Sequence, residues 1–226
     1  MASPLVINPS KDGRVIRVNT SHTNSFSDFV LGDGTEAQTG LEAGSVLFTS
    51  DTTENMWNTF HRLVFIFDTS DLPNDCTIDS ATLVIKCTAK SDALSFTPDV
   101  AVYGATTLSD TNVVAADYQT VASTAFSNVI AYGDITAGQN QTFTLNAAGL
   151  AAISKTGKTK FCLRNANCDV ANSAPSWASS VSSAISFSQS GSITKPVLTV
   201  NYTEAPPVVE INGIGALKAG RAFQRM

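Results

Sequence analysis

The fold class is decided by one stretch of the sequence, which reads Arg62-Leu63-Val64-Phe65-Ile66-Phe67-Asp68-Thr69-Ser70-Asp71-Leu72-Pro73. Within it Leu63, Phe65 and Phe67 are spaced two apart, so they point to the same side of an extended chain. Leu72-Pro73 ends the run with a turn, because proline fixes φ and lacks an N–H donor. The stretch therefore predicts a buried β-strand followed by a tight turn.

The same period of two recurs elsewhere in the chain. Every second residue from Ala81 to Cys87 is apolar, and Leu198, Val200 and Tyr202 alternate with their neighbours in the same way. About ten short strands separated by Gly, Pro and Asp turns are typical of a sandwich. We therefore predict an all-β protein, a two-sheet antiparallel β-sandwich of the jelly-roll type. The further strand candidates are Arg14–Val18, Asp28–Leu31, Ser45–Thr49, Val100–Tyr103, Ala125–Ile130, Thr142–Leu145, Lys160–Arg164 and Ala184–Phe187.

One short helix is expected at Ala147–Lys155. Asn146 precedes it and is a residue type that caps helix N-termini. Leu150 and Ile153 share one side of this helix, and Gly157 follows as a terminator. Such a helix would close one end of the sandwich.

The composition limits the function classes. Only 15% of the residues are charged and 43% are hydrophobic, which suits a globular domain with a sizeable core. Clustered Lys and Arg are lacking, so we expect no nucleic-acid partner. Residues 1–204 carry a net charge of −7 and residues 205–226 carry +2, out of a total of −5.

The two ends of the chain lead to separate expectations. The start, Met1-Ala2-Ser3-Pro4, lacks the basic residues and long apolar run of a secretion signal, and no stretch approaches the ~20 apolar residues of a membrane span. We expect no membrane contact and synthesis in the cytoplasm, unless the chain is a fragment. At the other end, Pro206-Pro207 cannot continue a central strand ladder. We predict a sandwich domain at 1–204 and an extended C-terminal arm at 205–226.

The arm is apolar, Gly-rich and basic, and a solvated arm would leave its large apolar residues exposed at a cost of ~25 cal/mol per Å². We therefore predict that it docks on a neighbouring subunit, by strand addition or in an apolar groove. A frayed tail is the alternative. The residues predicted to bind are Val209, Ile211, Ile214, Leu217, Lys218, Arg221, Phe223 and Arg225.

Cysteines and carboxylates give weaker signals. Cys76, Cys87, Cys162 and Cys168 form no Cys-x-x-Cys pair, so we expect reduced thiols, although a disulfide stays open. The acids that follow the strand at Arg62–Phe67 suit turn structure, with Asp68 and Ser70 bonding turn N–H groups. They also admit a structural calcium ion, and no other cofactor or metal is expected. These acids are Asp68, Asp71, Asp75 and Asp79.

No catalytic constellation stands out. His22 and His61 are the two histidines, and no Gly-x-Ser-x-Gly nucleophile motif accompanies them. A binding role is better marked, because exposed aromatic faces stack on sugar rings. The carbohydrate candidates in loop-like stretches are Trp57, Trp177, Tyr118 and Tyr132; the alternative is that they close the ends of the sandwich.

The quoted stretch, with Ile78-Asp79-Ser80-Ala81-Thr82-Leu83, resembles the signature of the DNRLRE-like and family-96 carbohydrate-binding-module β-sandwiches. The last-strand run Pro196–Tyr202 matches the same domains, and Thr144–Gly157 with Phe161–Arg164 is similar to phage virion proteins of this fold. The resemblance covers roughly residues 12 to 203. It implies a jelly roll that attaches to surfaces or contacts polysaccharide. Independently of the resemblance, we expect Arg62 to pair with an acid across the sheet.

Together these observations predict a non-enzymatic structural protein of a tailed phage virion, such as a capsid decoration, head-fibre or related surface protein. Its partners would be other virion proteins, copies of itself in a homo-oligomer, and polysaccharide of the host surface. The alternative is a carbohydrate-binding module of a polysaccharide-active system. A glycosidase or esterase built on a sandwich has the least support.

Overall fold

The structure is a computed structural model that describes residues 4–206. Twelve antiparallel strands dominate it, with two short α-helices, α1 and α2. In chain order the elements are β1 (Leu5–Ile7), β2 (Lys11–Val18), α1 (Phe26–Leu31), β3 (Glu36–Thr39), β4 (Ala43–Ser50), β5 (Trp57–Asp68), β6 (Thr77–Asp92), β7 (Val100–Ala105), β8 (Val121–Ala125), β9 (Asn140–Thr144), α2 (Ala147–Ala151), β10 (Lys158–Asn165), β11 (Ser182–Ser188) and β12 (Val197–Thr203).

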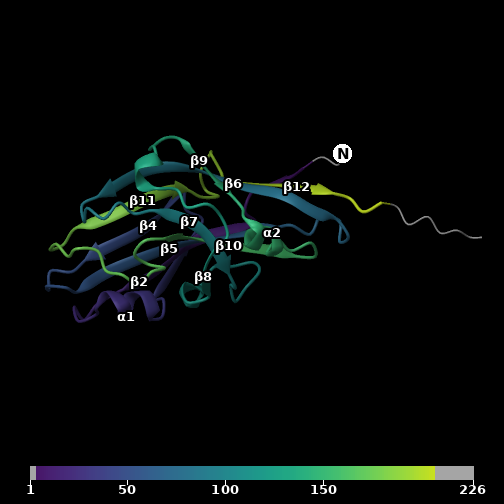
Figure 1. Cartoon of the computed structure of the whole chain (residues 1–226). Helices are drawn as coiled ribbons and strands as arrows, with labels where there is room; N and C mark the ends of the chain where they lie inside the picture. Colours follow the sequence, from purple (N-terminus) through teal and green to yellow (C-terminus); the bar gives the residue numbers. More distant parts are fainter. Residues whose placement is uncertain (1–3, 207–226) are drawn as a thin grey trace, which may run out of the picture.

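Two long strands organise the sheet. β5 pairs with β2 along one edge, while β4 and then β10 pair with its other edge. β6 pairs with β12 and β9 in its first part and with β11 in its second part. Because β11 also pairs with β4, the strands form one continuous sheet that folds over into two layers. Figure 1 shows β6, β9 and β12 in the layer above β5 and β2.

The main core fills the space between these layers. It joins Leu63, Phe65 and Phe67 of β5 to apolar residues of the facing strands, and all of them are buried. The all-β, antiparallel sandwich predicted from the sequence is therefore confirmed. The facing residues are Ala81, Leu83, Ile85 and Cys87 of β6, Phe143 of β9, Phe161 and Leu163 of β10, Ile185 and Phe187 of β11, and Leu198 and Val200 of β12.

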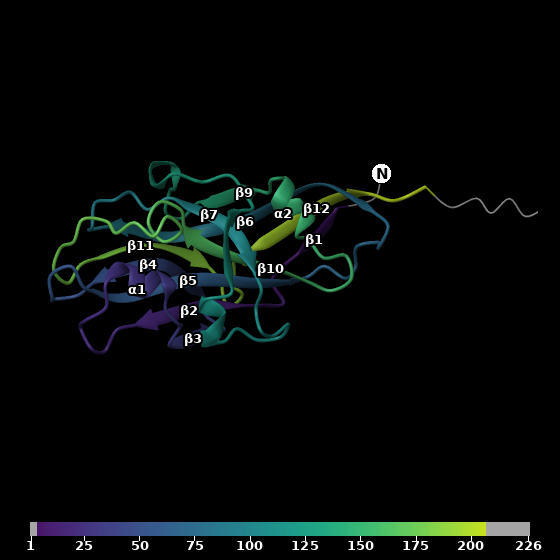
Figure 2. The same ribbon diagram turned by 60° about the horizontal axis from the view of Figure 1, so that its bottom comes forward.

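A second apolar cluster lies on the opposite face of β5. Phe60, Val64 and Ile66 alternate with the core residues and pack under α1 and the loops that follow β7 and β10. Figure 2 shows α1 lying across β4 and β5 on this face. The run from Leu63 to Phe67 is continuously apolar because β5 is buried on both of its faces.

Several local predictions were wrong. Asp28–Leu31 is not a strand but the last part of helix α1. A capping box between Ser25 and Asp28 stabilises the N-terminus of this helix. The Ser25 Oγ accepts from the Asp28 N–H, and the Asp28 carboxylate accepts from the Ser25 N–H. The pattern Ser-x-x-Asp is an N-terminal helix signal, so the strand assignment ignored information that the sequence contains.

The predicted strand Ala125–Ile130 was also misplaced, because β8 covers Val121–Ala125. After β8, polar side chains replace backbone carbonyls as hydrogen-bond partners of the neighbouring strands. The Ser127 Oγ accepts from the Val102 N–H, and the Asn128 Oδ1 accepts from the Thr144 N–H. Side-chain bonds of this kind compete with regular pairing and end a strand.

The predicted helix exists but is shorter than expected, because α2 ends at Ala151. The Asn146 cap is confirmed, since its Oδ1 accepts from the Gly149 N–H at 3.0 Å. The chain then turns toward β10 when the Ser154 N–H donates to the Thr159 Oγ1. Gly157 does not have the left-handed conformation of a helix terminator. Instead its carbonyl accepts from the Thr69 N–H.

The predicted assembly arm, including Val209, Ile211, Ile214, Leu217, Lys218, Arg221, Phe223 and Arg225, lies outside the described residues. Between residues 4 and 206, neither helix has the length and apolar character needed to cross a membrane.

Candidate functional site

Two of the four predicted carbohydrate-binding aromatics are buried. Trp57 is 2% exposed and lies in β5, and Tyr118 is 0% exposed. Trp57 packs edge-on against Phe26 and Phe60. The Tyr118 hydroxyl donates to the Phe29 carbonyl at 2.9 Å. Their prediction as exposed stacking surfaces was wrong, because both rings are structural parts of the second cluster.

Tyr132 is half-buried and lies apart from the other three, in a short 3₁₀ turn, Tyr132–Asp134. The Lys90 ammonium lies over its ring, 4.3 Å from the ring centre, and donates to its carbonyl at 2.8 Å. This cation–π contact covers one face of the ring, which leaves less of it for a ligand.

Trp177 is the candidate that the structure places in a surface hollow. The ring is half-buried, and its indole Nε1–H donates to the Met56 carbonyl at 3.1 Å, which fixes the ring's orientation. The hollow measures about 310 Å³. Its lining comes from the start of α1, the β4–β5 turn and the loop after β10: Ser25, Phe26, Ser27, Asn55, Trp57, Asn172, Ala174, Pro175 and Trp177.

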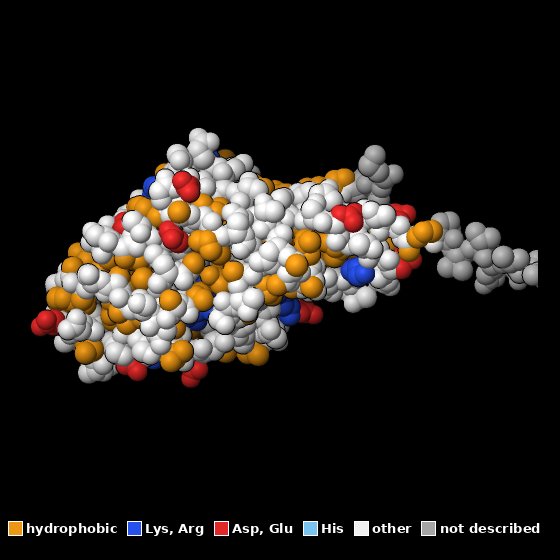
Figure 3. All heavy atoms as spheres, in the orientation of Figure 1, with side chains coloured by type: hydrophobic (Ala, Val, Ile, Leu, Met, Phe, Trp, Pro, Cys, Tyr) orange, Lys and Arg blue, Asp and Glu red, His pale blue; other side chains and the backbone are white. Residues whose placement is uncertain are grey.

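The Trp177 hollow combines an apolar floor with an uncharged polar rim. Trp57 and Phe26 are buried beneath it, while Ser27, Asn55 and Asn172 are exposed around it. Figure 3 shows hydrophobic side chains gathered among mostly uncharged groups over the end of the molecule that carries α1 and the tips of β4 and β5, with acidic side chains at its outer edge. No lining residue of this hollow is ionisable, so it lacks the groups that acid–base chemistry requires.

The β4–β5 turn beside the hollow is held in place by Asp51. This buried carboxylate accepts from the Thr53 N–H at 3.0 Å and from the exposed His22 ring, whose Nδ1 lies 2.8 Å away. The bond from the Thr53 N–H outweighs burial and, with His22, holds the pKa of Asp51 below its usual value. The turn that presents Asn55 is therefore a rigid part of the site.

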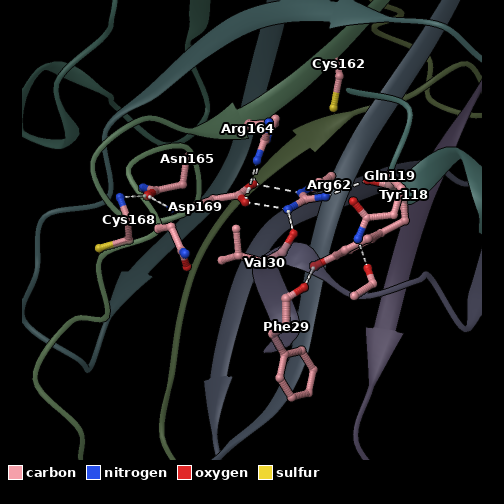
Figure 4. Close-up of polar contacts among 12 residues, drawn as sticks. Phe29, Val30, Arg62, Tyr118, Gln119, Cys162, Arg164, Asn165, Cys168 and Asp169 are labelled. Atoms are coloured by element: carbon pink, nitrogen blue, oxygen red, sulfur yellow. Dashed lines mark hydrogen bonds and ion pairs between the residues drawn. The ribbon is translucent and has the colours of Figure 1, made fainter. Parts of the chain in front are cut away.

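A buried ion network lies beneath the other end of α1. Arg62 of β5 and Arg164 of β10 both bind the Asp169 carboxylate through two N–H groups each, as Figure 4 shows. Arg62 donates to Asp169 at 2.9 and 2.6 Å, and Arg164 donates at 2.9 and 2.7 Å. Arg62 also donates to the carbonyls of Tyr118 and Val30, and its guanidinium carbon lies 4.0 Å from the centre of the Tyr118 ring.

The network fixes the protonation of its members. Burial alone would raise the pKa of Asp169, but the two guanidinium groups lower it to about 2. Burial lowers the pKa of Arg62, and Asp169 more than reverses this effect, so the net shift is upward. Asp169 and Arg62 are therefore charged near neutral pH, and the single carboxylate is shared by two guanidinium groups.

A second hollow of about 350 Å³ opens above this network. Asn172 borders both hollows, and its Nδ2 donates to the Ser27 Oγ at 3.0 Å between them. The lining of this guanidinium hollow is Val30, Leu31, Arg62, Gln119, Val121, Ala122, Ser123, Arg164, Asp169, Val170 and Asn172.

The sequence revealed only part of this arrangement. The prediction that Arg62 pairs with an acid is confirmed, and the acid is Asp169 in the loop after β10. Arg164 was placed in a strand without a role, and Asn172 was not singled out. One usable signal existed: Arg164 lies two positions after the apolar Cys162 and interrupts an inward-facing series, which marks a buried charge that needs a partner.

The remaining sequence candidates are scattered. Asp68, Asp71, Asp75 and Asp79 are all exposed, and Asp68 pairs with Lys158 Nζ at 2.5 Å. Within residues 4–206 no three His, Cys, Asp or Glu side chains gather as a metal site. His61 lies inside β5, where burial first and then Arg14 lower its pKa to about 4.

The four cysteines, Cys76, Cys87, Cys162 and Cys168, are buried and unpaired with one another. Burial raises the pKa values of the Cys162 and Cys168 thiols to about 12, so these two thiols are protonated and unreactive near neutral pH.

Comparisons with known proteins add little to this geometry. No family model matches the sequence, and no curated protein matches it either. Among solved structures, a xylan-binding module, CBM15, superposes with a TM-score of 0.38 at 13% identity, over 90% of this chain and 100% of the module. A likeness of this size does not carry over the module's ligand.

Proposed function

We propose that the domain is a carbohydrate-binding module and that the Trp177 hollow is where it holds polysaccharide. The observation that carries the proposal is the hollow's composition: a fixed indole above an aromatic floor, with hydroxyl and amide groups around it. Apolar faces of sugar rings stack on aromatic rings, and their hydroxyl groups pair with amides and hydroxyls.

The support is also electrostatic. A neutral sugar brings no charge to be balanced, and the lining of the Trp177 hollow contains no ionisable side chain. The same fact favours binding over turnover at this position, since neither a general acid nor a nucleophilic carboxylate borders it. Hydrogen bonds of the Ser25 cap and of Asp51 hold two of the segments that line the hollow, which would reduce the ordering entropy lost on binding.

The test is the substitution Trp177→Ala, measured by isothermal titration against the neutral glycans that the intact chain binds on a glycan array. We expect at least a tenfold weaker Kd, or about 1.4 kcal/mol, because the stacking surface is removed. Tyr132→Ala is the matched control, since it removes another half-buried aromatic, from a different part of the surface. Unchanged affinity in the Trp177 variant, or absence of any glycan binding, would refute the proposal.

The virion role is a separate prediction from the sequence. The arm predicted to mediate assembly, contact with other virion proteins and homo-oligomer formation lies outside the described residues. We propose the phage surface as the setting of this binding module, with host-surface polysaccharide as its target.

A further inference from the structure

The guanidinium hollow continues the Trp177 hollow along α1. Ser25 and Ser27, at the start of the helix, line the first hollow, and Val30 and Leu31, at its end, line the second. On the opposite side, the loop after β10 borders both hollows through Asn172. The two hollows are therefore neighbours that share Asn172, and an extended ligand held at Trp177 would reach the second one by crossing the Asn172–Ser27 hydrogen bond.

This second subsite carries an unbalanced charge. Its lining contains two guanidinium groups and one carboxylate, and no other ionisable residue, so the net charge is +1. The carbonyl oxygens of Val30, Tyr118 and Ala122 accept hydrogen bonds from these groups, but they carry no net charge. A charge buried without a counter-ion is unfavourable, and an anion in the hollow would complete the balance.

Guanidinium groups form the buried base of the hollow, where the Arg164 side chain is 7% exposed and the Arg62 side chain is 2% exposed. A guanidinium has five N–H groups, and Arg164 uses three of them, toward Asp169 and the Ala122 carbonyl. Arg62 uses four, toward Asp169 and the carbonyls of Tyr118 and Val30. The exposed side chains of Gln119, Ser123 and Asn172 stand at the mouth of the hollow and add neutral polar groups.

We propose that the guanidinium hollow binds a carboxylate substituent of the polysaccharide, so that the ligand is an acidic, uronate-containing chain. Guanidinium groups bind carboxylates with strong, charge-assisted hydrogen bonds. The proposal rests on the proposed function, because it names the class of sugar that reaches beyond Trp177.

The experiment compares neutral oligosaccharides of glucan, mannan and galactan with the same chains oxidised at C6 to the carboxylate. Each pair is titrated calorimetrically into the full-length protein. We expect the carboxylated member of at least one pair to bind about tenfold more tightly, which corresponds to about 1.4 kcal/mol. Equal affinity of both members in every pair that binds would overturn the acidic subsite and leave the carbohydrate module standing.

Two variants of Arg164 test whether the preference for carboxylated chains arises in the guanidinium hollow. Arg164→Gln leaves Arg62 and Asp169 as a balanced pair, so the ratio of acidic to neutral affinity should fall to about one. Arg164→Lys keeps the charge and should retain part of the preference. Thermal melting verifies that each variant folds. If the Gln variant does not fold, a salt titration of the unmodified protein decides, because a charge-based preference shrinks with ionic strength and a steric one does not.

The outcomes separate the two proposals. Acidic chains that bind with unchanged affinity to Trp177→Ala would support the guanidinium subsite and refute the Trp177 hollow. Failure of every pair to bind would refute both. A preference that survives Arg164→Gln in a folded protein would place the acid-binding groups elsewhere and overturn the inference.

Discussion

The two faces of β5 are built on different principles. On one face, Leu63, Phe65 and Phe67 enter a core made of apolar residues from the facing layer. On the other, Phe60, Val64 and Ile66 share the face with Arg62, whose charge is met by Asp169 from the loop after β10. Both faces are buried, yet only the second one includes an ion network and borders the surface hollows.

The difference separates what makes the fold from what makes the site. The main core joins strand to strand and needs only apolar residues of suitable size. The second cluster joins β5 to a helix and to loops, whose backbone carbonyls need donors when they are buried. Arg62 supplies those donors to Val30 and Tyr118, and in doing so it holds Val30 in the wall of the guanidinium hollow.

A truncation in the main core should cause the largest loss in the free energy of unfolding. Phe65→Ala removes a ring that is fully buried, and we expect the free energy of unfolding to fall by about 4 kcal/mol, as for other buried aromatic truncations. Urea denaturation measures the change. Leu108→Ala, at a residue that is 69% exposed, is the control and should alter the stability by less than about 0.5 kcal/mol. Similar effects for the two would contradict the assignment of this core.

Disrupting the ion network should give the second-largest loss in the free energy of unfolding. Asp169→Ala leaves two buried guanidinium groups without a counter-charge, so we expect a loss of about 3 kcal/mol or more by the same denaturation assay. The triple change Arg62→Met, Arg164→Met and Asp169→Leu removes every charge, and it should be much less destabilising than the single change. If Asp169→Ala and the triple variant were equally destabilised, the hydrogen bonds of the network, and not only its charge balance, would stabilise the second cluster.

The smallest of the three expected changes in the free energy of unfolding is the one caused by acid, which should affect only the face of β5 that carries the ion network. The pKa of Asp169 is lowered to about 2 in the folded state, against about 3.9 in an unfolded chain. Its contribution is therefore complete above about pH 5 and is lost progressively as the pH falls to about 1, by about 2–3 kcal/mol in all. Denaturation across this range should show the loss in the intact protein and in Phe65→Ala. In Asp169→Asn, the part of this acid-induced loss of stability that is due to the Asp169 carboxyl should be missing. If Asp169→Asn lost as much stability in acid as the intact protein, the lowered pKa of Asp169 would be refuted.

Local patterns predicted much of the sheet. The apolar run Leu63–Phe67 and the alternation at Ala81–Cys87 mark strands that the structure contains, and Asn146 caps α2 as its side-chain chemistry suggests. These features depend on neighbours in the chain, which the sequence displays directly. The helix that contains Asp28–Leu31 begins with a capping box that is equally local, so this element too could be predicted from the sequence.

The candidate site was much harder to predict. Trp57 and Trp177 are 120 positions apart, yet they line one hollow, and one of them is its buried floor. Nothing in the local sequence distinguishes a tryptophan that closes an end of the sandwich from one that faces solvent. Arg62 and Asp169 likewise meet across a separation of 107 residues.

By itself, the sequence determined the spacing of apolar residues, and with it the strands and the class of fold, because side chains two positions apart must share a face of an extended chain. Only the tertiary structure decided which aromatics are exposed, which acid meets Arg62, and that two hollows meet at Asn172. Those outcomes depend on how distant segments close over β5, and burial and charge balance are properties of the assembled surface, not of any segment alone.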